Sequence, residues 1–280
     1  MHLVLGGGAC TGVCYYSALL DSLGWDRFDI PFETITVYSA SSVSLSLYLL
    51  GIPMSAASIH QFWTAIYQSI NPISVLEGAQ RSLLQREVVV TAALEAFPGL
   101  SSEWTLLDLF ILTGVRVQYG VSAIVDSGMQ GTVLNHETHP HLSVVDAMLS
   151  SCCVPLLFEP VYVAPHGALY DGELTCEVIG DVYVKLTDRG YPATGHAFVD
   201  QMLTVILALA LQNTRRITRL ARAAQASIVI APITSIFDVT IDDCERAFEV
   251  GRLSVEAFDA AVETSRSRQA EAAEKKCKTV

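Results

Sequence analysis

The sequence predicts an α/β fold in which helices cover both faces of a central sheet. Strand-like and helix-like patterns alternate along the chain, which is typical of this class. A length of 280 residues with 51% apolar residues allows a sizeable core. No repeat and no low-complexity linker interrupts the pattern, so we expect a single domain over residues 1–280. Its core should cover about 3–262, followed by a C-terminal tail at about 263–280.

The first half of the chain predicts two strands, each followed by a helix. Residues 2–5, HLVL, form a strand pattern that leads into the glycine cluster GGGACTG and then into a helix. Residues 32–38 predict the second strand, and residues 42–50 predict the helix behind it, which Gly51 should end. Residues 55–113 then predict mostly helix, with breaks at NPIS and FPGLSS.

The second half continues the alternation. Its predicted segments are, in chain order, a strand at 115–125, a helix at 142–151, an extended piece at 155–163, turns at 166–174, a long helix from about 198 to 225, a strand at 226–233 and a last helix at 242–263. The longest apolar run begins at Met202 and is about half as long as a bilayer span, so we interpret it as a buried helix.

Net charge and cysteine content make several functional classes of protein unsuitable for this sequence. A formal net charge of −12 and a pI of about 4.9 repel nucleic acid. The chain enters its first strand pattern at once, without a signal-peptide pattern, so we expect a cytoplasmic protein that contacts membranes at most peripherally. Seven cysteines without CxxC spacing suit a reducing compartment better than a disulfide framework.

The glycine cluster at residues 6–12 is the first candidate site. A glycine loop before a helix exposes backbone N–H groups that can bind a phosphate or an oxyanion, but the same glycines could serve only a tight turn. The cluster lacks the GxGxxG pattern of dinucleotide-binding folds and the GK[ST] ending of a P-loop. A nucleotide-binding domain would therefore need a phosphate-contacting lysine or an acidic ribose partner that the sequence does not offer.

The segment VYSAS at residues 37–41 is the second candidate. A strand that stops at a serine before a helix is the layout of a nucleophile elbow, where the residues two before and two after the serine approach each other and are usually glycine. Here these two places hold Val37 and Ser41. From this segment alone, an ordinary strand-to-helix junction is the alternative interpretation.

Later segments resemble the patatin-like phospholipase family. The run SVVDAMLSSCCVPLLFEPV followed by ALYDGEL carries the resemblance, and the pieces TLLDLFILTG, GVSAIVDSG, IAPI and FEVGRLSVEAF agree with it in order from about residue 3 to about residue 260. The resemblance implies a three-layer α/β/α sandwich with a mainly parallel sheet. It also implies hydrolysis of acyl esters by a Ser-Asp dyad.

The resemblance assigns the dyad to Ser39 and Asp171. The family's serine stands twelve residues before a glycine that closes its helix, and Ser39 stands twelve residues before Gly51. The family's aspartate falls in DGG or DGA, which matches Asp171 but leaves Glu173 as a departure. Asp171 would accept the Ser39 proton as Oγ attacks the ester carbonyl.

The resemblance also implies that Gly7, Gly8 and Ala9 bind the oxyanion. Ala9 replaces a glycine of the family's GGGxRG loop, and Thr11 replaces its arginine or lysine. Backbone donors survive such changes, whereas the loss of the cation is harder to offset. The side chains that replace the elbow glycines should crowd the bend, so we expect low activity or dependence on an activator or a lipid surface.

Other polar residues offer weaker alternatives. His196 follows Asp171 in the chain order of a Ser-Asp-His triad, although such triads usually have more strands before the serine. A histidine-rich loop could hold a metal ion, but we expect a solvent-facing loop there; its histidines are His136, His139 and His141. One face of a predicted helix could bind lipid head groups, but we expect a solvated face; its arginines are Arg215, Arg216, Arg219 and Arg222.

The expected function is a lipid acyl hydrolase of the phospholipase A, lysophospholipase or esterase type. Its substrate would be a phospholipid or another acyl ester, and it would need neither a metal nor an organic cofactor. A protein activator is compatible with the sequence but is not identified by it, and nucleic acid is not an expected partner. The alternative is a patatin-like domain that has lost catalysis and acts as a binding or scaffold protein.

Overall fold

The computed structural model describes residues 1–70, 72–78, 80–126, 128–186, 201–202, 204–206, 208, 226–230 and 239–278. Within these residues, the strands are β1 (His2–Leu5), β2 (Thr34–Val37), β3 (Arg116–Val125), β4 (Gly128–Leu134), β5 (Val161–Val163), β6 (Gly167–Asp171), β7 (Val182–Leu186) and β8 (Ala226–Ile230). The helices are α1 (Ala9–Ser22), α2 (Ala40–Leu49), α3 (Ala56–Gln68), α4 (Pro72–Leu76), α5 (Arg86–Ala96), α6 (Leu106–Thr113), α7 (Val144–Cys152), α9 (Ile241–Leu253) and α10 (Val255–Lys278).

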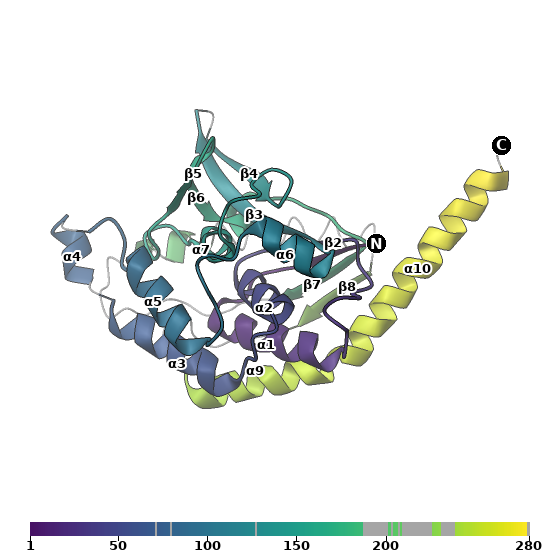
Figure 1. The fold of residues 1–280 in the computed structure, drawn as a ribbon, viewed down its shortest axis with the longest axis horizontal. Coiled ribbons are helices and arrows are strands. Elements are labelled where there is room, and N and C mark those ends of the chain that lie inside the picture. Colours follow the sequence, from purple (N-terminus) through teal and green to yellow (C-terminus); the bar gives the residue numbers. More distant parts are fainter. Residues whose placement is uncertain are drawn as a thin grey trace.

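The strands join in one mainly parallel sheet (Figure 1). Its order is β5-β6-β3-β2-β1-β7-β8, and β4 pairs with β3 outside this path. The five strands from β3 to β8 in that order run parallel, whereas β4, β5 and β6 add antiparallel pairs at the other end. The neighbours of β1 are β2, which follows it in the chain, and β7, which comes much later. Such a switch in strand order is where α/β sheets bind ligands, outside the carboxyl ends of the strands.

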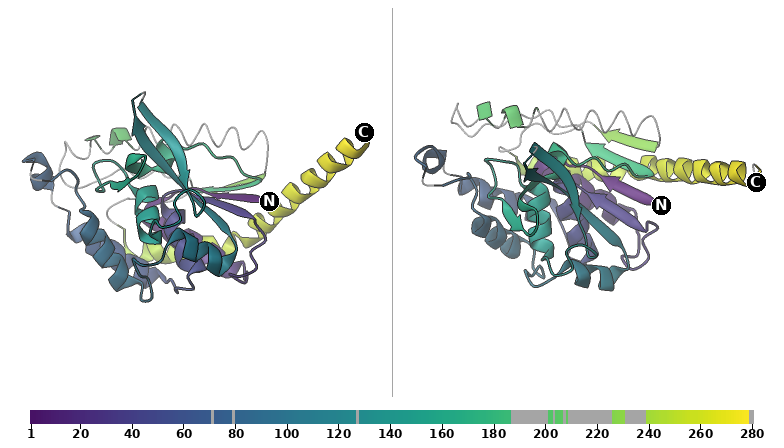
Figure 2. Two further views of the ribbon diagram at one scale, coloured as in Figure 1. Left: turned by 45° about the horizontal axis from the view of Figure 1, so that its top comes forward. Right: turned by 90° about the horizontal axis from the view of Figure 1, so that it is seen from above.

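Helices lie on both sides of the sheet, which confirms the predicted fold class (Figure 2). Strand β1 shows the two faces by alternation, since Leu3 and Leu5 join the large core under α1, α2 and α3. Val4, between them, packs on the opposite face with Tyr38 and Tyr183. All five side chains are at most 2% exposed, so the strands that carry the candidate site are fixed by apolar contacts on both faces.

Several helices begin and end where local chemistry predicts. Thr105 caps α6 and Thr240 caps α9, each in a capping box with an aspartate three residues later. Gly51 has a φ of 70° just after α2, as expected for the glycine that ends this helix. Gly51 thus ends the helix that has Ser39 at its N-terminus.

The structure differs from the sequence-based segments at three strands. Residues 167–171, predicted as turns, form β6, and β4 and β7 were not predicted at all. β4 and β6 form antiparallel pairs with β3, and β7 pairs with β1 and β8, so their formation depends on tertiary pairing more than on local pattern.

The predicted last helix is divided at Ser254 into α9 and α10. Residues 263–278, predicted as a tail, continue α10, which projects from the body of the molecule (Figure 1). The predicted long helix at 198–225 lies mostly outside the described residues. Within the described part of the chain, no helix is both long and apolar enough to cross a bilayer.

Candidate active site

Ser39 sits at the bend between β2 and α2, where an elbow was predicted. Its backbone has φ 50° and ψ −125°, a left-handed conformation that is rare for residues other than glycine. The bend places Ser39 at the N-terminus of α2 and beside the glycine loop that precedes α1. An elbow therefore forms although neither Val37 nor Ser41 is glycine.

Polar contacts hold this bend in place. The Ser41 hydroxyl accepts a hydrogen bond from the Tyr38 amide at 3.0 Å and donates to the Leu5 carbonyl at 2.8 Å. The Ser39 amide donates to the Ser151 carbonyl of α7 at 3.1 Å. The buried Ser41 hydroxyl therefore links α2 to β1 and stabilises the turn in a place where glycine was expected.

Glycines on neighbouring segments make room for Tyr38. A Cβ atom on Gly120 of β3 would lie 2.1 Å from the Tyr38 ring, and one on Gly172 would lie 2.8 Å from it. These two glycines let the Tyr38 ring pack beside the elbow, a contact that the sequence pattern of the elbow does not reveal.

Asp171 ends β6 and lies next to Ser39. It is 4% exposed, and its Oδ1 accepts a hydrogen bond from the Glu173 amide at 2.9 Å. Its own amide donates to the Cys153 carbonyl at 2.8 Å, and its carbonyl accepts from the Ser122 hydroxyl at 2.8 Å. The Ser39 hydroxyl and this carboxylate line the same pocket, and the hydroxyl acts to lower the pKa of Asp171. The structure therefore brings the two predicted dyad residues together.

The surroundings raise the pKa of Asp171 to about 7. Burial is the largest cause, because it disfavours the charged carboxylate, and the negative charge of Glu173 adds to it. Hydrogen bonds from the Glu173 amide and the Ser39 hydroxyl, and the positive charge of Lys185, act in the opposite direction. A carboxyl with this pKa can exchange a proton with a nearby hydroxyl near neutral pH.

The glycine loop lies against the elbow. A Cβ atom on Gly7 would be 2.9 Å from the Cβ of Ser39, so only glycine fits between the loop and the serine. Gly12 similarly lets α1 approach α2, since a Cβ there would lie 3.0 Å from the Cβ of Ala40. Ala9 keeps a φ of 50°, a conformation that favours the glycine expected at this place.

Two charged side chains occupy the space in front of this loop. The Gly7 amide donates a hydrogen bond to Oε1 of Glu173 at 2.9 Å. Lys185 of β7 pairs with the same oxygen at 3.5 Å, and its side chain is only 3% exposed. Because Leu5 pairs with Val184, the next residue on β7 lies level with the loop. Lys185 thus supplies a cation close to the loop, where Thr11 replaces the expected one.

A large apolar cavity opens beside these residues. Ser39, Asp171, Gly7, Gly8 and Ala9 all line it. Its space amounts to about 1600 Å³, a value that includes open solvent at its mouth.

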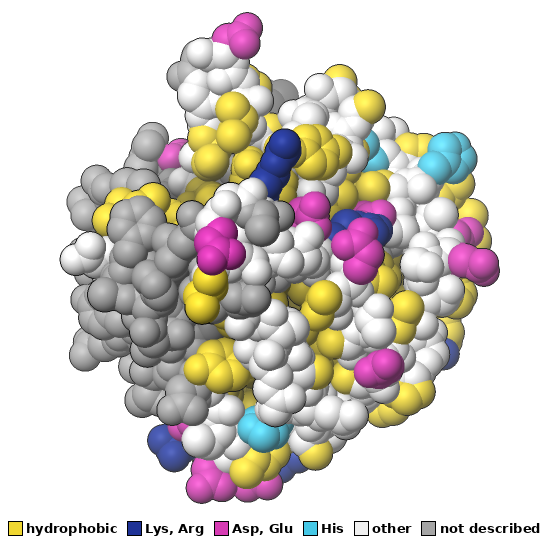
Figure 3. All heavy atoms as spheres, turned by 90° about the vertical axis from the view of Figure 1, so that its left-hand side faces the viewer, with side chains coloured by type: hydrophobic (Ala, Val, Ile, Leu, Met, Phe, Trp, Pro, Cys, Tyr) yellow, Lys and Arg dark blue, Asp and Glu magenta, His cyan; other side chains and the backbone are white. Residues whose placement is uncertain are grey.

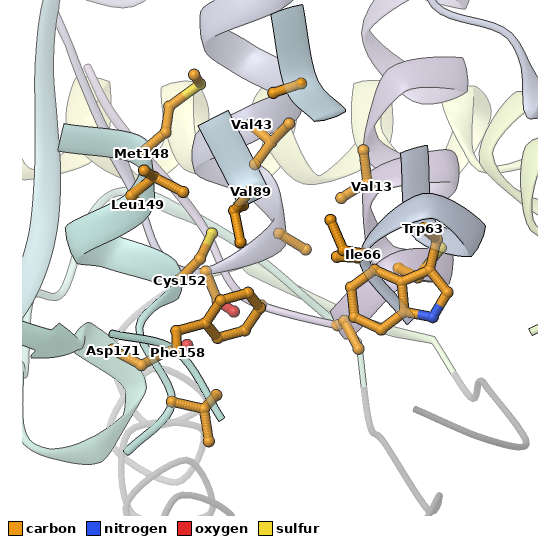
Figure 4. A pocket seen from close by; sticks show the side chains of 18 of the residues that line it. Val13, Val43, Trp63, Ile66, Val89, Met148, Leu149, Cys152, Phe158 and Asp171 are labelled. Atoms are coloured by element: carbon orange, nitrogen blue, oxygen red, sulfur yellow. The ribbon is translucent and has the colours of Figure 1, made fainter. Parts of the chain in front are cut away.

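Most of its wall comes from the helices. Figure 4 shows Asp171, Cys152 and Phe158 near one another, with the apolar side chains of α1, α2, α3 and α5 across the cavity from them. The labelled apolar residues are Val13, Val43, Trp63, Ile66, Val89, Met148 and Leu149. An apolar space beside a serine suits a hydrocarbon chain.

His136 and His139 of the histidine-rich loop do not line this cavity. His136 stacks on Phe110 with ring centroids 3.7 Å apart, and Nδ1 of His139 is 2.8 Å from the Thr138 hydroxyl. In the described ranges, no group of three or more His, Cys, Asp or Glu residues could hold a metal ion. His196 and the arginines at 215–222 lie outside the described residues.

Sequence reasoning missed two residues that shape the site. Ser151 lies in the segment that carried the family resemblance, and its contact with the Ser39 amide could have been sought there. Lys185 had no local signal, because one lysine in an otherwise apolar strand pattern does not reveal which segment the strand will join.

Comparisons with known proteins find similarity to solved structures. No protein-family model matches the chain, and a search of curated proteins finds no match. The chain is similar to the crystal structure of VipD from Legionella pneumophila, with 14% identity and a TM-score of 0.49, over 93% of this chain and 67% of that one. It is similar to the type III effector protein ExoU, with 12% identity and a TM-score of 0.43, over 93% of this chain and 53% of that one.

A further similar structure is full-length ExoU in complex with SpcU, from the type III secretion system of Pseudomonas aeruginosa. It shares 16% identity with this chain, with a TM-score of 0.35, over 81% of this chain and 53% of that one. The chain therefore spans about two thirds of VipD and about half of ExoU.

Proposed function

We propose that this protein is a patatin-like lipid acyl hydrolase that uses Ser39 as nucleophile and Asp171 as base. The observation that carries the proposal is the buried carboxyl of Asp171, with a pKa near neutrality, beside a serine on a left-handed elbow. An ordinary strand-to-helix junction needs neither the unusual backbone of the serine nor an acidic partner for its hydroxyl.

The chemistry follows from these positions. Asp171 accepts the hydroxyl proton as Ser39 Oγ bonds to the carbonyl carbon of the ester. The resulting tetrahedral intermediate collapses when the alcohol leaves and takes up the proton, and an acyl-enzyme remains. Water then attacks the acyl carbonyl carbon while Asp171 takes its proton, the bond to Ser39 Oγ breaks, and the proton passes to Ser39 as the carboxylic acid leaves. The amides of the loop that contains Gly7, Gly8 and Ala9 stabilise the negative oxygen in both halves.

The cavity supports an acyl ester with a long hydrocarbon chain as the substrate. Its apolar wall runs from Asp171 and Ser39 to helices α3 and α5, so an acyl chain can lie in it while its ester group faces the dyad. Each methylene group that leaves water contributes about 0.8 kcal/mol. The chain would therefore supply much of the binding energy of the substrate.

Exposed apolar side chains support peripheral contact with a lipid surface. Ile73 of α4 is 59% exposed, Val88 of α5 is 37% exposed, and Tyr162 of β5 is 67% exposed. Figure 3 views the side of the molecule on which α4 and α5 lie, where hydrophobic side chains stand among acidic and basic ones. Side chains of this kind suit shallow contact with a lipid surface rather than insertion.

The proposal is tested by hydrolysis of p-nitrophenyl esters and of phospholipid vesicles. Ser39→Ala and Asp171→Ala should each lose nearly all turnover, and the double variant should be little slower than either single variant, because the two residues act as a unit. The matched controls Ser102→Ala and Asp259→Asn change exposed residues and should keep wild-type rates. His196→Ala should also stay active.

Two outcomes would change the proposal. Wild-type turnover by Ser39→Ala would refute the dyad, and a loss in His196→Ala as large as in Ser39→Ala, with the fold intact, would indicate a Ser-Asp-His triad. A second candidate function, an acyl-chain binding protein without catalysis, is favoured by the Glu173 carboxylate on the Gly7 amide. Saturable fatty-acid binding without ester hydrolysis in any variant would support it.

A further inference from the structure

The Glu173 carboxylate lies where a reacting ester would need the glycine loop. Its Oε1 accepts from the Gly7 amide at 2.9 Å, and a Cβ atom on Gly7 would lie 2.8 Å from Glu173 Cδ and 2.9 Å from Ser39 Cβ. Oxyanion donors work when they are about 2.7–3.1 Å from the negative oxygen. The carboxylate oxygen thus makes the contact that the oxyanion of a tetrahedral intermediate would make.

Lys185 completes this arrangement. Its ammonium group is 3.5 Å from the same Glu173 oxygen, and its side chain is 97% buried, whereas that of Glu173 is 22% exposed. A buried cation needs a compensating anion, because burial strongly disfavours an unpaired charge. When Glu173 moves outward to solvent, the Lys185 ammonium group and the Gly7 amide can donate hydrogen bonds to a different negative oxygen.

We propose that Lys185 is a catalytic residue that stabilises the oxyanion, and that Glu173 is an internal anion that occupies its place in the resting protein. The inference rests on the proposed function, because it concerns the oxygen that becomes negative when Ser39 attacks. The Gly7 amide and the Lys185 ammonium form one cradle for that oxygen. Each turnover then requires the Glu173 side chain to leave the cradle and the substrate carbonyl oxygen to enter it.

This arrangement accounts for two departures from the family pattern together. Thr11 removes the usual cation of the loop, and Lys185 returns a positive charge from β7. Glu173 takes the place of a glycine or alanine, which could not fill the cradle. The resting protein should therefore react slowly, although its dyad is assembled.

A fluorophosphonate probe tests the cradle directly. Ser39 Oγ bonds to phosphorus, the P–F bond breaks, fluoride leaves, and the hydroxyl proton passes to Asp171, while the phosphoryl oxygen enters the cradle. The measurement is the rate constant of labelling in wild type, Glu173→Gln, Lys185→Met and the double variant at about pH 9, where Asp171 is ionised with or without the charge of Glu173. Glu137→Gln is the matched control, because it neutralises a glutamate of an exposed ion pair with Arg116.

We expect labelling of Glu173→Gln to be at least about tenfold faster than that of wild type, because a neutral amide is held less strongly than a carboxylate by N–H and ammonium donors. In the Glu173→Gln background, Lys185→Met should slow labelling by about a hundredfold, as for loss of one oxyanion donor. Lys185→Arg should keep more of the rate. In ester hydrolysis, these effects should fall on kcat more than on KM.

Two results would overturn the inference. Glu173→Gln labelled no faster than wild type would refute the internal anion, and an unchanged rate on adding Lys185→Met would refute the role of the lysine. If Glu173→Gln does not fold, Glu173→Asp gives the same test, since its shorter carboxylate cannot reach Gly7 and labelling should again be faster. Failure of the proposed function looks different, because then no variant is labelled at Ser39.

Discussion

Replacement of Asp171 by asparagine should change how the stability of the protein depends on pH. The folded-state pKa of Asp171 is about 7, against an ordinary value of 3.8. Because the pKa is raised on folding, the stability from this group is fully present below 3.8 and is lost as pH rises through 7. Asparagine keeps the size and the acceptor oxygen but has no charge to bury, so the variant should not show this loss.

The size of the effect follows from the two pKa values. Relative to low pH, the difference between the two pKa values lowers the free energy of unfolding by about 1.7 kcal/mol near pH 5 and by about 4 kcal/mol near pH 8. The free energy of unfolding of Asp171→Asn, minus that of wild type, should therefore rise by about 2–3 kcal/mol between these pH values. Urea unfolding at both pH values measures this change, and any constant effect of the asparagine cancels.

The control for this experiment is Asp259→Asn, which changes an exposed aspartate of α10. Its difference from wild type should stay within about 0.5 kcal/mol at both pH values, as is usual for surface substitutions. If the difference between Asp171→Asn and wild type is independent of pH, Asp171 is not held at a raised pKa, and the argument that it serves as a base near neutral pH fails.

Two further predictions concern turnover. The value of kcat/KM should rise with pH with a midpoint near 7, because Asp171 must be ionised to accept the Ser39 proton. Glu173→Gln should lower this midpoint, because it removes the charge that helps to raise the pKa of Asp171. A flat profile from pH 5 to 9 would contradict this prediction. Ala93→Leu narrows the cavity at α5, so it should lower the ratio of kcat/KM for p-nitrophenyl palmitate to that for p-nitrophenyl butyrate by about tenfold. This factor corresponds to one to two methylene groups excluded from the cavity. An unchanged ratio would place the acyl chain elsewhere.

The sequence predicted those parts of the fold that depend on local pattern. The strands and helices around the glycine loop and around Ser39 follow from apolar runs bounded by glycine, and the structure has them close to the predicted places. β6 was predicted as turns because glycines flank it, yet it forms a strand by pairing with β3 and β5. Its end carries Asp171, so the position of the base depends on pairing that local pattern does not contain.

The contacts of the candidate site depend still more on tertiary structure. The sequence marked Val37 and Ser41 as side chains that should crowd the elbow, but not that Gly120 and Gly172 would open space for Tyr38. It marked Glu173 as a departure, but not its contact with Gly7. These contacts join residues more than 80 positions apart, and the order of the strands in the sheet brings them together.

The most direct test of the account is to identify the residue that a fluorophosphonate modifies. After labelling of the wild-type protein, peptide mass spectrometry should find the phosphonate on Ser39, and Ser39→Ala should carry none. Ser41 and Ser42 are the natural controls, because both are buried hydroxyls within three residues of the proposed nucleophile. A phosphonate on either of them, or equal labelling of Ser39→Ala and wild type, would contradict the assignment of Ser39 as the nucleophile.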